Sequence, residues 1–167
     1  MKLPVLLGLL AACGGPTAEA PLTVELGITH DAAERDLHAH QFCRVQGQIN
    51  SNHEMYPRCD RTAAELGEAW VNATFEGDKL VELRRWERYP DDNRAVERWN
   101  EMLAARAKIS TPSDEALQHL RERGLLPAGT RSVKAFRGRD GIVIGVYLLT
   151  PSPPENANVL EQVSYEK

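Results

Sequence analysis

The chain has 167 residues and a formal net charge of −4, with 42% hydrophobic and 26% charged residues. This balance is ordinary for a folded protein and excludes global disorder, and the length suits one domain or two small, closely packed halves. The acidic charge and the lack of a basic cluster give no electrostatic surface for nucleic acid or for anionic lipid.

The first element is a short apolar segment, residues 3–10, preceded by Lys2. It is shorter than the roughly 20 residues that a membrane-spanning helix needs, which favours a cleaved signal over an anchor helix. Its end, Leu10-Ala11-Ala12-Cys13, resembles the lipobox of bacterial lipoproteins. An ordinary secretory signal, cut near residue 18 or 20, is the alternative. Both interpretations predict export.

The lipobox resemblance implies that residues 1–12 are a signal peptide and that Cys13 carries fatty acyl chains. Several such chains bind a membrane effectively permanently. Residues 13–20 then form a flexible tether, because they are small and polar without periodicity. Gly14 after Cys13 favours sorting to the outer membrane, with the domain facing the periplasm. We therefore expect a lipoprotein of the bacterial cell envelope.

Of the three cysteines, the lipobox takes one, which leaves Cys43 and Cys59. In an oxidising compartment this pair predicts a disulfide bond, with a stabilisation of roughly 3 kcal/mol in the loop-entropy model. A metal site is the alternative, but the two cysteines lack the close spacing that zinc sites usually show.

The sequence pattern of the mature chain predicts alternating groups of helices and strands. Thr29 caps a helix expected over residues 30–41, and residues 43–49 alternate like a strand before a loop at 51–57. Residues 66–75 and 79–89 predict a hairpin around Glu76-Gly77-Asp78. The remaining expectations are a helix over 93–109, a helix capped by Thr111 and ending at Gly124, and strands over 132–137, 141–150 and 159–165.

This order predicts an α+β fold, with antiparallel sheet strands and helices packed on one face. Residues 21–167 form the domain, and the repeated order is compatible with two related halves, 21–90 and 91–167. Two helices followed by a three-stranded meander in residues 93–165 resemble the small lipoprotein subunit of the outer-membrane β-barrel assembly machinery and its relatives, including tandem-domain inhibitors of β-lactamase. The resemblance assigns no functional residue.

A metal site is one chemical hypothesis. His30, Glu34 and His38 lie at i, i+4 and i+8, so a helix brings two imidazoles and a carboxylate onto one face, and His40 and His53 would extend the set. A solvated polar face explains the same spacing, because the third side chain lies about 12 Å along the axis from the first. The chain carries neither HExxH nor GxSxG, so we expect a non-enzymatic protein and no cofactor.

The strongest candidate for a partner surface lies near the end of the long hairpin strand, where aromatic and basic residues alternate: Arg84, Arg85, Trp86, Arg88 and Tyr89. Tryptophan and arginine are enriched at binding hot spots. The alternative is that Trp86 packs under a helix while the arginines pair with Glu82 and Glu87. We therefore expect a module that binds an envelope protein or another envelope component; a metal-binding or hydrolytic lipoprotein and an inhibitor of an exported enzyme are the alternatives.

Overall fold

The computed structural model describes residues 20–45, 51–60, 69–150 and 157–166. The signal, Cys13 and most of the tether lie outside this part. Three helices are described: α1 (His30–Ala39), α2 (Asp92–Arg106) and α3 (Asp114–Glu122). The described strands are β1 (His53–Pro57), β2 (Ala69–Glu76), β3 (Lys79–Tyr89), β4 (Thr111–Pro112), β5 (Thr130–Arg137), β6 (Ile142–Leu149) and β7 (Ala157–Tyr165).

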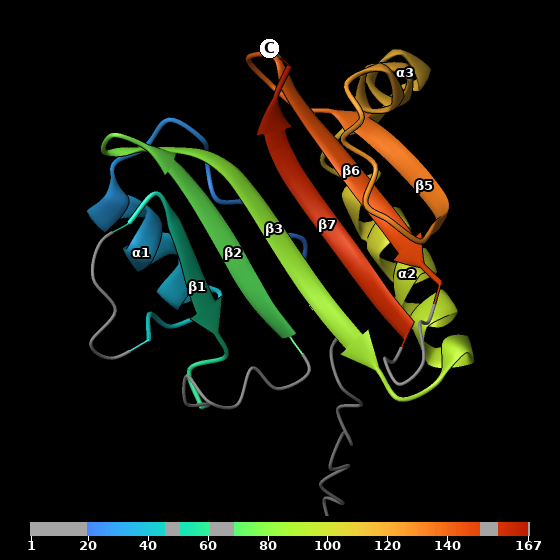
Figure 1. The fold of residues 1–167 in the computed structure, drawn as a ribbon, viewed down its shortest axis with the longest axis horizontal. Coiled ribbons are helices and arrows are strands. Elements are labelled where there is room, and N and C mark those ends of the chain that lie inside the picture. The colour runs from blue at the N-terminus through green and yellow to red at the C-terminus, as the bar shows by residue number, and fades with distance from the viewer. Residues whose placement is uncertain (1–19, 46–50, 61–68, 151–156, 167) are drawn as a thin grey trace, which may run out of the picture.

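In the described residues these strands form one antiparallel sheet in the order β1-β2-β3-β7-β6-β5-β4 (Figure 1). Each half of the chain supplies a meander, β1-β2-β3 or β5-β6-β7, and the third strands of the two meanders pair with each other. The α+β fold with an antiparallel sheet is therefore confirmed. A single sheet runs through both halves.

The helices cover both faces of the sheet, so the expectation that they pack on one face is wrong. Helices α1 and α2 bury Leu37 and Met102 in the main core, together with Ile144 and Val146 of β6. Helix α3 instead packs Leu120 against Val143 and Tyr147, on the opposite side of the same strand. Because β6 is apolar on both sides, it is covered on both. We call the two sides the α2 face and the α3 face.

The hairpin is the most accurately predicted element. Strands β2 and β3 are joined by Gly77 and Asp78, and Gly77 has a φ of 61°, a conformation that glycine adopts without steric cost. Helix α1 begins after Thr29, whose side chain accepts a hydrogen bond from the Ala32 amide, as expected. Gly124, with a φ of 64°, follows the end of α3.

Two local predictions are wrong. Residues 53–57 are strand β1 rather than a loop. The prediction missed this strand because one of its two inward residues, Glu54 and Tyr56, is a polar glutamate, which hides the alternation of apolar and polar residues. The cap of α3 is Ser113, whose hydroxyl accepts from the Ala116 amide, whereas Thr111 pairs with β5 in the short strand β4. The strand expected over 43–49 lies largely outside the described residues.

Candidate binding site on the α3 face

Strand β3 divides the predicted partner residues between the two faces of the sheet. Side chains alternate along a strand, and Arg85 and Glu87 are buried on the α2 face, where Tyr89 also packs. Arg84, Trp86 and Arg88 occupy the alternate positions, on the α3 face. Arg85 is only 1% exposed, so the expectation that it shares an exposed surface with Trp86 is wrong.

Buried charges explain the polar residues of β3. Arg98 of α2 donates from Nε and Nη2 to the Glu87 carboxylate at 2.7 and 3.0 Å, and Arg85 also contacts it. Burial alone would raise the pKa of Glu87, but the Arg98 hydrogen bonds and the adjacent guanidinium charges lower it to about 2. The charges therefore satisfy one another beneath α2 and are unavailable to a partner.

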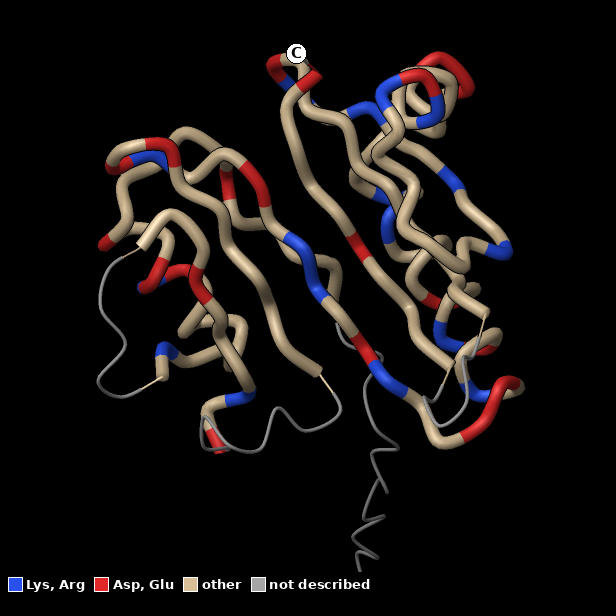
Figure 2. Tube along the Cα trace, in the orientation of Figure 1, with Lys and Arg blue, Asp and Glu red and all other residues tan. Residues whose placement is uncertain are grey.

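A second buried pair holds the N-terminal segment, residues 20–26. Arg106 Nε donates to Glu161 at 2.9 Å, and its Nη2 donates to the Leu22 carbonyl at 2.8 Å. The Leu22 amide donates to Glu161 at 3.2 Å, and Arg85 Nη1 donates to the Ala20 carbonyl at 2.8 Å. Charged residues accordingly lie in the middle of β3 and β7, the two central strands (Figure 2). These buried charges hold Ala20 and Leu22 by their backbone groups.

The α3 face carries a cluster of two indoles and a guanidinium group. Trp70 of β2 and Trp86 of β3 are directly opposite in the ladder, and their ring centroids are 6.1 Å apart with 10° between the planes. The Arg88 guanidinium carbon lies 5.3 Å from the Trp70 centroid, within cation–π range. Sequence analysis identified Trp86 and Arg88; it did not select Trp70, because only the register shows that the two indoles meet.

These three residues border a hollow of about 340 Å³ that Asn72 and Asn158 complete. Arg88 is exposed, and no ion-pair partner for it occurs among the described residues. The Trp86 Nε1 is buried without a hydrogen-bond partner in the same part of the chain. We call Trp70, Asn72, Trp86, Arg88 and Asn158 the tryptophan hollow. Trp70 is only 8% exposed, so the hollow presents the partly exposed Trp86 ring, two amide side chains and the exposed Arg88 guanidinium group to solvent.

Arg84 lies beside the hollow with its charge already paired. Its Nε lies 2.9 Å from a Glu82 carboxylate oxygen, and the Gln162 amide donates to the same carboxylate at 2.8 Å. Arg84 and Gln162 therefore both contact Glu82, whereas Arg88 is the cation available to a ligand.

The structure does not assemble the histidine site suggested by helical spacing. His30 is 6% exposed, and its Nε2 lies 2.8 Å from a Glu54 carboxylate oxygen that also accepts from the Tyr56 hydroxyl. Burial would raise the pKa of Glu54, but hydrogen bonds from Tyr56, the Ser51 amide and His30 outweigh it and lower that pKa. Glu34 and His38 border a surface depression that His30 does not line. The three residues therefore do not form one metal site.

The remaining two histidines are also apart. His40 Nε2 lies 3.2 Å from the Thr23 hydroxyl, and His53 Nδ1 lies 3.3 Å from the Thr74 hydroxyl. Neither histidine therefore joins His30 in a shared metal site.

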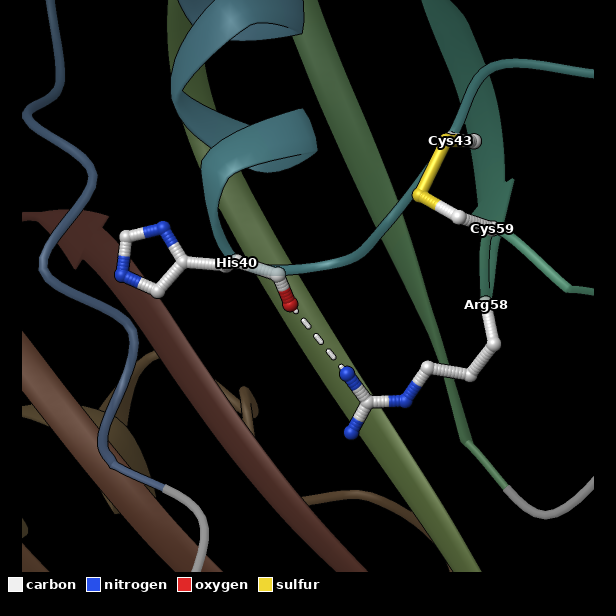
Figure 3. Close-up of a disulfide and its surroundings, with 4 residues drawn as sticks. All are labelled: His40, Cys43, Arg58 and Cys59. Carbon is white, nitrogen blue, oxygen red and sulfur yellow. Dashed lines mark hydrogen bonds between the residues drawn. A yellow bond between two sulfur atoms is a disulfide. The ribbon is translucent and has the colours of Figure 1, made fainter.

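Cys43 and Cys59 form the predicted disulfide bond, which joins the segment after α1 to the end of β1 (Figure 3). Their Cα atoms are 4.6 Å apart, within the usual range for a disulfide. Among the described residues, the one group of three potential metal ligands is His38 with these two cysteines.

Comparison with known proteins finds no matching family model, no similar curated protein and no similar solved structure. The lipobox and the helix-helix-meander resemblance therefore stay predictions. None of the described helices is long and apolar enough to cross a membrane.

Proposed function

We propose that this chain is a lipid-anchored, non-enzymatic protein of the bacterial cell envelope, which binds another envelope protein through the tryptophan hollow. The observation that carries the proposal is the pairing of Trp70 with Trp86 beside the unpaired, exposed Arg88. Tryptophan and arginine are enriched among the few residues that carry most of the binding energy at protein interfaces.

The surroundings of the hollow suit a protein partner. No described helix lies over the β1-β2-β3 end of the α3 face, since α1 packs on the other side and α3 lies over β5 and β6. An aromatic or amide-bearing side chain of the partner would meet the partly exposed Trp86 ring, the Arg88 guanidinium group and the Asn72 side chain within one hollow.

The anchor would place this surface near the membrane. Ala20 is held by Arg85, and it lies seven positions after Cys13 in the sequence. A chain of that length spans at most about 25 Å when fully extended. If Cys13 is acylated, Ala20 lies within that distance of the lipid. The disulfide bond agrees with a location outside the reducing cytoplasm.

Site-specific photocrosslinking in intact cells tests the proposal. A photoreactive amino acid replaces Asn72, a partly exposed residue that lines the hollow, or Asn100, an exposed residue of α2. We expect the Asn72 position to capture one envelope protein, and the Asn100 position not to. Trp86→Ala should abolish the capture.

Equal capture from both positions, or capture that survives Trp86→Ala, would contradict a binding site at the hollow. A captured exported enzyme whose activity falls on binding would define the chain as an inhibitor. Arg85 is unsuitable as a test position, because that residue is buried and its loss would disturb the fold rather than the surface.

A further inference from the structure

We propose that reduction of the Cys43–Cys59 disulfide creates a site for one thiophilic cation, Zn²⁺ or Cu⁺, held by both thiolates and by the imidazole of His38. Among the described residues, the ligand atoms of these three side chains all lie within 4.8 Å of one another. Thiolate and imidazole are the ligands that these cations prefer in proteins. The site differs from the histidine set predicted by helical spacing, with which it shares only His38.

Contacts that do not involve sulfur hold the two cysteine segments together. Phe42 and Arg58 form an antiparallel bridge beside the disulfide. The Cys43 amide donates to the Pro57 carbonyl at 2.9 Å, and the Cys59 amide donates to the Gln41 carbonyl at 3.1 Å. The Phe42 ring is buried and the Arg58 guanidinium carbon lies 4.1 Å from its centroid. The two thiols are therefore expected to stay adjacent after reduction.

His38 is placed to complete the site. It lies in the last turn of α1 and is exposed, so its side chain is free to rotate. Both cysteines are partly exposed, which gives a reductant and a cation access to the sulfur atoms. Zn²⁺ binds sulfur at about 2.3 Å and histidine nitrogen at about 2.0 Å, which places ligand atoms roughly 3.5 to 4 Å apart. Small side-chain rotations bring the present atoms to that spacing. Three protein ligands leave the fourth position of Zn²⁺ to water.

The conversion has a defined balance. A dithiol reductant gives two electrons and two protons to the disulfide, which becomes two thiols, while the reductant closes to its own disulfide. The cation then displaces one proton from each thiol and binds the two thiolates. Oxidation of the thiols by a disulfide-forming enzyme or another disulfide would release the cation, so the site would respond to the redox state of its surroundings.

Metal competition tests the proposal. The full chain with Cys13→Ser, which removes the third thiol, is reduced with a phosphine under anaerobic conditions; the phosphine becomes its oxide with an oxygen from water. Zn²⁺ is then titrated against a chromophoric chelator, and Cu⁺ against bicinchoninate. We expect the reduced protein to bind one equivalent of at least one of the two cations, and the oxidised protein to bind neither. His38→Ala should weaken binding by at least about tenfold.

The matched control is His40→Ala. The His40 ring points away from the disulfide and lies 3.2 Å from the Thr23 hydroxyl, so its removal should leave binding unchanged (Figure 3). The double variant Cys43→Ser/Cys59→Ser should bind neither cation. Far-ultraviolet circular dichroism reports the fold of each sample. No uptake of either cation by the reduced protein, parental affinity in His38→Ala, or unfolding on reduction would each overturn the proposal.

Discussion

Arg106 of α2 and Glu161 of β7 form an ion pair inside the protein, with the Arg106 Nε 2.9 Å from the carboxylate and side chains only 4% and 0% exposed. The same two residues hydrogen-bond to the backbone of Leu22. The pair thus connects a helix, a central strand and the segment through which the proposed tether enters the domain.

Arg106→Met should destabilise the domain strongly, because it leaves the Glu161 carboxylate buried without its partner. We expect a loss of about 3 to 5 kcal/mol in the free energy of unfolding, measured by urea denaturation. Arg131→Met removes the half-exposed pair with Asp92 and should cost at most about 1 kcal/mol. Similar losses in the two variants would show that the buried pair has no special role.

Replacement of Arg88 and of Arg85, two arginines on opposite faces of β3, should have different effects on the free energy of unfolding. Arg88→Ala removes an exposed side chain and should change the unfolding free energy by no more than about 0.5 kcal/mol, while it weakens partner capture. Arg85→Ala leaves Glu87 with one fewer buried partner and should cost several kcal/mol, on the order of 3. Thermal denaturation of the two purified variants makes the comparison. A stable Arg85→Ala protein would contradict the division of β3 into two faces.

The assignment of these faces shows what the sequence can and cannot predict. The hairpin follows from Gly77 and from the apolar alternation that ends at Leu83, and Pro90 follows the end of β3 at Tyr89. Beyond Leu83 the inward residues are Arg85 and Glu87, and a strand pattern cannot distinguish a buried ion pair from a wet face. The distinction depends on Arg98, which reaches them from α2.

The other contacts of the candidate sites depend on how distant segments pair, which the sequence pattern does not show. Trp70 and Trp86 are sixteen positions apart, and they meet only because of the β2-β3 pairing. The disulfide was predictable since two cysteines in an exported chain have one simple pairing, whereas the approach of His38 depends on where α1 ends. The placement of α3 on the second face follows from β6, whose apolar residues on both sides require two covering layers.

Acid should destabilise the domain through Glu87. Its pKa is about 2 in the folded protein against 4.5 for the ordinary side chain. A depressed folded pKa contributes stability that is fully present above the unfolded pKa and is lost as the pH falls from about 4.5 towards 2. The loss should be on the order of 3 kcal/mol. Glu87→Gln should show a shallower decline in unfolding free energy between pH 5 and 2; an unchanged decline would contradict the assignment.

Removal of the disulfide should weaken the domain without unfolding it. The bond closes a loop with a sequence separation of 16, which predicts a loss of about 3 kcal/mol in Cys43→Ala/Cys59→Ala. The bridge between Phe42 and Arg58 should keep the segments paired, with retained circular dichroism at 25 °C. Complete unfolding of the variant would show that the disulfide, rather than the backbone bridge, holds this region.

The intact mass of the protein purified from bacterial membranes tests the central claim, a lipid-anchored envelope protein, most directly. The account predicts a chain that begins at Cys13 and carries the added mass of its acyl groups, and a Cys13→Ser variant that leaves the membrane fraction. A chain that retains residues 1–12, or a mature chain that begins after Cys13, would contradict it.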